Sequence, residues 1–238
     1  MKLIRVWLSL AAAVGIAVSA PAMAQEKAGV RPGFEETQIA GEKIVLFRPD
    51  IKVGEQSMGG LFEPRAEWTD TARELIGAEL ERAQVNLSNE LVKMPELDDE
   101  DAELLDEYQA LFDTVSDSII EYQFFPGNRL PTRKGGDFDW TLGPGTSRLA
   151  ELSGARYGLF IMTEDQYGST GRKIAQLFIG VQSGVHKGAA GLVDLQTGHV
   201  LWMNADLQMG GDVRDAEGVK KRVRQLLEDF PGSTPAAE

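Results

Sequence analysis

Four short apolar runs, separated by amphipathic segments, constrain the fold of this chain more than any other feature. They are rich in Val, Ile and Leu and span 43–47, 157–163, 189–195 and 199–207. Short β-branched runs bounded by Gly, Pro or Asp are typical of buried strands. The last two runs meet at Gln196-Thr197-Gly198, where glycine can take the positive φ of a tight hairpin turn.

Helical patterns lie between these runs. Thr71 and Glu74 fit a capping box for a helix that is expected to end near Asn86. After Pro95, an acidic start leads into one apolar stripe from Leu104 to Tyr122, the clearest helical pattern in the chain. Three shorter helices are predicted, with starts at Thr146 or Ser147, at Ser169–Gly171 and at Asp215, and with Gly154, Gly180 and Pro231 at their ends.

This order predicts an α/β fold with a mixed sheet of about four or five strands packed with helices. One domain is expected over residues 42–231. Residues 25–41 are predicted to be a flexible leader, 51–64 a loop that can include a short extended piece, and 232–238 a disordered tail. Residues 124–146 are predicted to form a long internal loop rich in Pro and Gly.

The first 24 residues have the pattern of a secretory signal peptide. Lys2 and Arg5 precede an apolar stretch from Val6 to Val18, and Ala22-Met23-Ala24 is a pattern that signal peptidase accepts. A transmembrane anchor is the alternative, but the apolar run is short for a span of about 20 residues. We therefore predict cleavage before Gln25 and a periplasmic or secreted protein. No later stretch is apolar enough to predict a transmembrane segment in the mature chain.

Composition excludes several kinds of function. The net charge is −13, whereas nucleic-acid binding needs a basic footprint. The chain has no cysteine, which excludes disulfides, thiol catalysis and a lipidated cysteine, and it has only two histidines, His186 and His199. The acidic run from Glu96 to Asp101 lacks the spacing of a calcium loop. No metal, cofactor or catalytic residue is predicted.

Three segments carry a family resemblance: Phe138–Gly145, Arg156–Arg172 and Gly191–Trp202. Together they resemble uncharacterised secreted proteins of Gram-negative bacteria. More loosely, the C-terminal order of strand, Asp-x-x-Thr-Gly turn, strand ending in Trp, and helix is similar to small periplasmic α/β domains. Examples are the N-terminal domain of the Tol-Pal propeller protein, the lipoprotein activators of penicillin-binding proteins and the periplasmic domain of the curli secretion channel. This resemblance implies non-enzymatic work in envelope assembly.

One candidate ligand site lies between the strand at 157–163 and the helix that follows it. Its proposed residues are Asp165, Tyr167, Ser169, Thr170 and Arg172. Ligands of α/β sheets tend to bind beyond the carboxyl ends of strands, and helix-start amides beside an arginine can hold an anion. The alternative is an ordinary strand–helix turn in which the serine caps the helix.

The long loop is a candidate partner-binding site. It carries three bases and two aromatic residues, a combination common in recognition hot spots: Arg129, Arg133, Lys134, Phe138 and Trp140. The alternative is that Trp140 and Leu142 hold the loop on the core.

The apolar segment from Ile174 to Val185 has two interpretations. Core packing is favoured over membrane contact, because few bases flank it.

The sequence thus predicts a non-enzymatic binding protein whose partner is another envelope protein. The alternatives are a small-anion or small-molecule binder at 165–172 and a carboxylate-based hydrolase, since 37 acidic residues provide many possible pairs.

Overall fold

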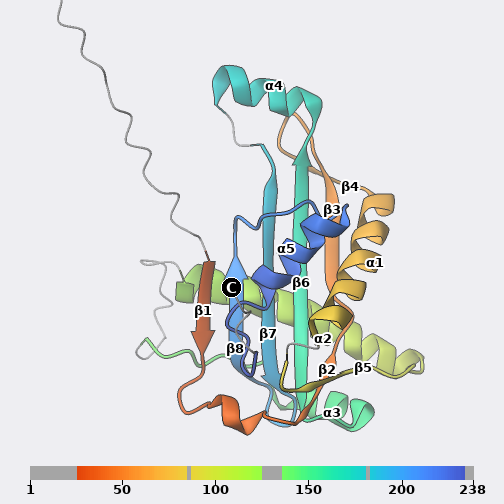
Figure 1. Ribbon diagram of the computed structural model, residues 1–238, viewed down its shortest axis with the longest axis vertical. Coiled ribbons are helices and arrows are strands. Elements are labelled where there is room, and N and C mark those ends of the chain that lie inside the picture. Colours follow the sequence, from red (N-terminus) through yellow and green to blue (C-terminus); the bar gives the residue numbers. More distant parts are fainter. Residues whose placement is uncertain (1–25, 85–86, 125–135, 181–182, 234–238) are drawn as a thin grey trace, which may run out of the picture.

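A computed structural model describes residues 26–84, 87–124, 136–180 and 183–233 (Figure 1). The fold is α/β, as predicted, but its single mixed sheet has eight strands rather than four or five. The sheet follows the order β1-β8-β7-β6-β2-β5. In addition, β3 pairs with the C-terminal half of β6, residues 162–168, and β4 pairs with β3. The predicted signal peptide, residues 125–135 of the predicted loop and residues 234–238 of the predicted tail lie outside the described residues.

The strands are β1 (Glu26–Val30), β2 (Lys43–Leu46), β3 (Asp50–Gln56), β4 (Phe62–Pro64), β5 (Glu90–Lys93), β6 (Tyr157–Gly168), β7 (Val185–Asp194) and β8 (His199–Asp206). The α-helices are α1 (Ala66–Ala83), α2 (Asp99–Ile119), α3 (Ser147–Ser153), α4 (Thr170–Ile179) and α5 (Ala216–Leu226). Short turns of helix occur at η1 (Glu36–Gln38), η3 (Ile120–Phe124) and η4 (Pro144–Thr146).

The additional strands were missed for two physical reasons. β1 falls in the expected flexible leader and β5 in a segment with no predicted element. Both are short edge strands, and none of their residues whose burial is described, 27–30 and 90–93, is buried. Such strands have no apolar alternation to reveal them. β3 and β4 fall in the expected loop 51–64. There Ile51 and Val53 are buried and Lys52 between them is exposed, a two-residue period that is obscured by the nearby glycines.

Most predicted helix ends are confirmed. Asp98, Ser169 and Asp215 each accept a backbone N–H at the start of α2, α4 and α5. Gly154 and Gly180 take left-handed conformations after α3 and α4. The capping box at Thr71 is wrong. α1 begins five residues earlier at Ala66, so the Thr71 hydroxyl lies inside the helix and donates to Glu67 O over 2.8 Å.

The central strand β6 divides the interior into two cores. Its odd-numbered side chains from Tyr157 to Ile161 pack with α1 and α5, whereas Phe160 and Met162 face α2 and α3. This alternation is the two-residue period of a strand buried on both faces. Figure 1 shows α5 and α1 on one side of the sheet and α2 crossing the other. The same alternation places Asp165 and Tyr167, farther along β6, on the side of α5.

Candidate functional site

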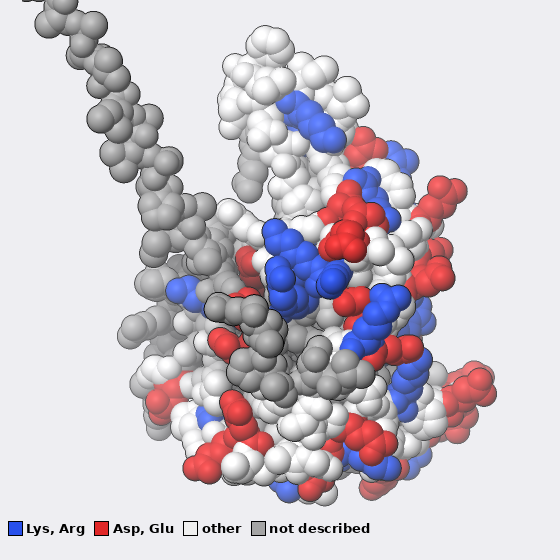
Figure 2. Space-filling model, in the orientation of Figure 1, with Lys and Arg blue, Asp and Glu red and all other residues white. Residues whose placement is uncertain are grey.

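Among the residues that the structure describes, a helical projection at one end of the sheet carries the largest group of exposed apolar side chains. We call it the apolar tip and define it by six residues with their exposed fractions: Met58 (69%), Leu61 (74%), Ile174 (50%), Leu177 (83%), Phe178 (82%) and Ile179 (74%). The first two lie in the turn between β3 and β4, and the other four lie on α4. Figure 1 shows α4 standing clear of the body beyond the ends of β6 and β7. Figure 2 shows this projection largely white above a body of mixed charge.

Local hydrogen bonds hold the two parts of the tip together. Ser169 N donates to Gln56 O over 2.9 Å, which joins the start of α4 to the end of β3. Arg172 Nη1 donates to Met58 O over 3.3 Å. Gly60 has a φ of +88°, and a Cβ atom there would lie 3.2 Å from Arg172 Nη1, so glycine suits both the turn and the close approach. These contacts fix the turn and the helix relative to each other, so the tip is an ordered surface.

The preference for core packing of Ile174–Val185 is wrong for α4. None of its residues is buried, although Ile174, Leu177 and Phe178 form a regular stripe at helical spacing. An amphipathic period shows that one face of a helix prefers an apolar surrounding, but the sequence does not say whether this chain supplies it. Met58 and Leu61 were not identified as site residues, because they lie in a turn without periodicity.

A cluster of polar side chains lies beneath α5, apart from the apolar tip. Asp165 of β6 and Arg222 of α5 are both 0% exposed and form a two-point ion pair at 2.6 and 2.8 Å. His186, opposite Asp165 on β7, places Nδ1 2.7 Å from Asp165 Oδ1, the oxygen that also accepts from Arg222 Nη2. Thr163 Oγ1 accepts from Arg222 Nη1 over 2.7 Å. Arg222 also donates to the carbonyls of Gly210 and Gly211, so its charge is well satisfied.

These bonds determine the charge of Asp165. Burial raises the pKa of the carboxyl, but hydrogen bonds from His186 and Arg222 outweigh it and hold the pKa below its ordinary value. A bidentate pair with both partners fully buried has no face left for a ligand. The group's role is therefore to fasten α5 to the sheet.

The five residues of the predicted 165–172 site do not share one surface. β6 extends to Gly168, five residues beyond its expected end, so Asp165 and Tyr167 point toward α5 from within the sheet. The Tyr167 hydroxyl donates to Asp212 Oδ1 over 2.8 Å. Ser169 Oγ accepts from Arg172 N over 3.3 Å, the capping arrangement of the alternative interpretation, and Thr170 is the exposed first residue of α4. Anion binding by this set stays a prediction, and Asp165 is already fully bonded.

The predicted partner loop is only partly described. Arg129, Arg133 and Lys134 lie outside the described residues. Phe138 is buried and lies 6.4 Å from the ring of Phe124, and Trp140 is partly buried against the same core. The two aromatic residues thus pack inward, which fits the alternative that the loop is held on the core.

One carboxylate pair bears on the hydrolase alternative. Asp50 and Asp113 both bond to Lys52, at 2.6 and 3.0 Å. Burial, together with the hydrogen bond to Asp50, raises the pKa of Asp113 to about 7. Pairs with separated pKa values serve acid–base catalysis elsewhere. Here the adjoining hollow has no room for even a water-sized sphere, whereas small-molecule sites occupy about 300–1,000 Å³.

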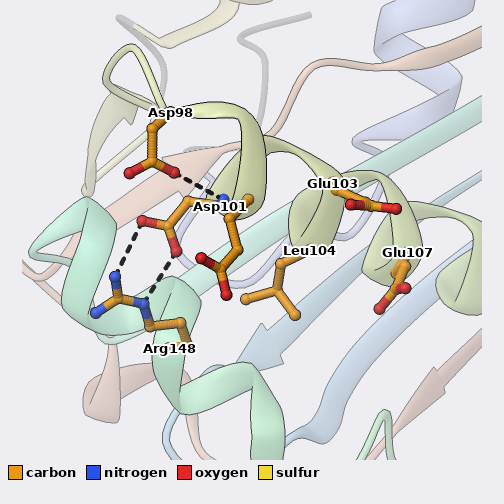
Figure 3. A pocket seen from close by; sticks show the side chains of 7 residues that line it. Asp98, Asp101, Glu103, Leu104, Glu107 and Arg148 are labelled. Atoms are coloured by element: carbon orange, nitrogen blue, oxygen red, sulfur yellow. Dashed lines mark hydrogen bonds and ion pairs between the residues drawn. The ribbon is translucent and has the colours of Figure 1, made fainter.

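A larger open hollow of about 500 Å³ lies between the start of α2 and α3 (Figure 3). Its lining is mostly acidic, and Asp101 bonds to Arg148 at 2.9 and 3.1 Å. Asp98 is occupied in capping α2. Within the described residues, no group of three or more His, Asp or Glu is arranged to hold a metal ion.

Comparison with known proteins gives a low structural likeness. No family model and no curated protein matches the chain. A PelC dodecamer from Paraburkholderia phytofirmans shares 12% identity at a TM-score of 0.41, over 88% of this chain and 98% of that one. Lipoprotein GNA1162 from Neisseria meningitidis shares 15% identity at a TM-score of 0.29, over 69% of this chain and 79% of that one. None of the helices in the described ranges has the length and apolar character needed to cross a bilayer.

Proposed function

We propose that this protein is exported and acts without catalysis, as a binding protein that docks to the cell envelope through its apolar tip. The observation that carries the proposal is the exposure of six large apolar side chains on one projection. Scattered exposed apolar residues are ordinary on soluble proteins, but a contiguous group marks an interaction surface. The export signal predicted over residues 1–24 supports an envelope location.

The construction of the tip supports this function. Its side chains are presented by a capped helix and a hydrogen-bonded turn, which limits the entropy lost when they are buried by a partner. The polar clusters fit structural roles better, because Asp165 and Arg222 are fully buried and bonded to each other and the Asp50–Asp113 pair adjoins only a small hollow.

Cell fractionation tests the proposal. In a Gram-negative host, the processed wild-type protein should sediment with the membranes. The double variant Leu177→Ser/Phe178→Ser should move largely to the soluble fraction, because it removes the two most exposed apolar side chains of the tip. Val30→Ser/Leu111→Ser is the matched control, since it changes exposed apolar residues on β1 and α2 instead. Equal sedimentation of the tip variant and the wild type would contradict the proposal.

A further inference from the structure

We infer that the surface bound by the apolar tip is an anionic lipid membrane, into which the end of α4 inserts. This inference rests on the proposed function and names the occupant of the same site. Three features of the described residues favour lipid: the local charge, the shape of the projection, and the lack of a matching apolar surface on the chain itself.

The local charge is opposite to that of the whole protein. The chain has a net charge of −13, yet residues 56–62 and 166–193 contain no Asp or Glu. Arg172 and Lys173 lie in the first turn of α4, and Lys173 is exposed and has no acidic partner within the described ranges. At the base of the tip, Arg65 pairs with Glu55 at 2.6 Å and with Glu63 at 3.7 Å, and Lys187 pairs with Glu164 at 3.3 Å, so the unpaired charge above the base is that of Arg172 and Lys173. The tip therefore presents net positive charge, which attracts anionic headgroups.

The shape of the tip suits insertion into a fluid surface. α4 projects beyond the sheet, so its end can enter a membrane without contact by the acidic body (Figures 1 and 2). Leu177, Phe178 and Ile179 form the end of the helix, and Lys173 lies one turn earlier. An interfacial helix buries its apolar side about 5–10 Å into the boundary between headgroups and acyl chains, with basic residues at headgroup level. α4 would reach the same depth order by entering with its end, because its apolar last turn would lie below the headgroups and its basic first turn at their level.

A second copy of this chain fits the tip less well. A symmetric tip-to-tip dimer would bring two tips of net positive charge together, and that repulsion disfavours it. The exposed large apolar residues outside the tip are Val30 and Leu111, on different elements of the described chain. Neither forms an apolar receptor for the four apolar residues of α4.

Vesicle flotation tests the inference with the full exported chain, purified after signal cleavage. The probes are vesicles of phosphatidylcholine alone and vesicles with 30 mol% phosphatidylglycerol, a composition chosen to resemble anionic bacterial lipid. Wild-type protein should float with the anionic vesicles, and binding should fall at least about tenfold for Leu177→Ser/Phe178→Ser. Lys173→Gln should reduce binding to anionic vesicles several-fold and leave binding to neutral vesicles unchanged. The thermal melts of both variants should match that of the wild type, because these side chains are exposed.

The remaining outcomes overturn the inference in distinguishable ways. If no vesicle floats the protein, while fractionation in cells still depends on Leu177 and Phe178, the partner is an envelope protein; lipid is excluded and the proposed function stands. If sedimentation velocity shows a dimer that the tip variant abolishes, and no vesicle floats the protein, a second copy occupies the tip. Equal binding of wild type and tip variant to the vesicles would show that other residues bind lipid.

Discussion

Arg222→Met is expected to destabilise the protein by about 3–5 kcal/mol, because it leaves the buried carboxylate of Asp165 without its main counter-charge. For a chain of this size, that loss corresponds to a melting temperature lower by roughly 6–20 °C. Urea denaturation at pH 7 measures it. Arg224→Met is the matched control, since Arg224 is exposed on the same helix and its loss should change stability by about 0.5 kcal/mol or less.

The pH dependence of this effect separates charge from packing. In the wild type, the pKa of Asp165 is below its ordinary value, so its stabilising contribution is present above that value and is lost as the pH falls. In the variant, burial without Arg222 favours the protonated carboxyl, so acid relieves the penalty. The difference in unfolding free energy between wild type and Arg222→Met should therefore shrink from pH 7 toward pH 4. A constant difference would mean that the arginine acts through packing alone.

Phe112→Ala should cost about 3–5 kcal/mol of unfolding free energy, because it opens a cavity where α2 crosses the sheet. The Phe112 ring stacks on Phe160 at a centroid distance of 5.0 Å. It also fills the space over Gly191, where a Cβ atom would lie 2.6 Å from it. Equilibrium urea denaturation, followed by circular dichroism, measures the loss.

The neighbouring residue provides the control for this substitution. Leu111 lies on the same helix and is partly exposed, so Leu111→Ala should cost about 1 kcal/mol or less. Similar losses for the two variants would contradict the packing of α2 through Phe112.

The parts of the fold with strong periodicity were predictable. The stripe from Leu104 to Tyr122 indicated α2, and buried β-branched runs indicated β2, β6, β7 and β8. Edge strands were not predictable, because residues 27–30 of β1 and 90–93 of β5 are not buried and both strands depend on a neighbour for their hydrogen bonds. β1 can pair only once β8 is in place, and β5 only once β2 is in place, so their formation depends on tertiary structure.

The candidate sites show a similar division. A helix at 170–179 was predictable from Ser169 and Gly180, but its exposure was not, because an amphipathic period has the same form whether its partner is internal or external. Asp165 was singled out, yet its role was hidden by the underestimated length of β6. In a strand that runs to Gly168, alternation from Ile161 places Asp165 on the face of the sheet that α1 and α5 cover. Its partner Arg222 lies 57 residues away in sequence, and only tertiary structure joins the two.

The most direct test of membrane docking uses the absence of cysteine from the chain. A single Leu177→Cys substitution gives one attachment point for an environment-sensitive fluorophore at the apolar tip. Glu151→Cys gives the matched control on α3, where the side chain is 67% exposed and lies outside the tip. With anionic vesicles, emission from position 177 should shift to the blue and intensify, as a probe entering an apolar medium does, while emission from position 151 stays unchanged. Identical spectra at position 177 with and without vesicles would contradict insertion of the tip.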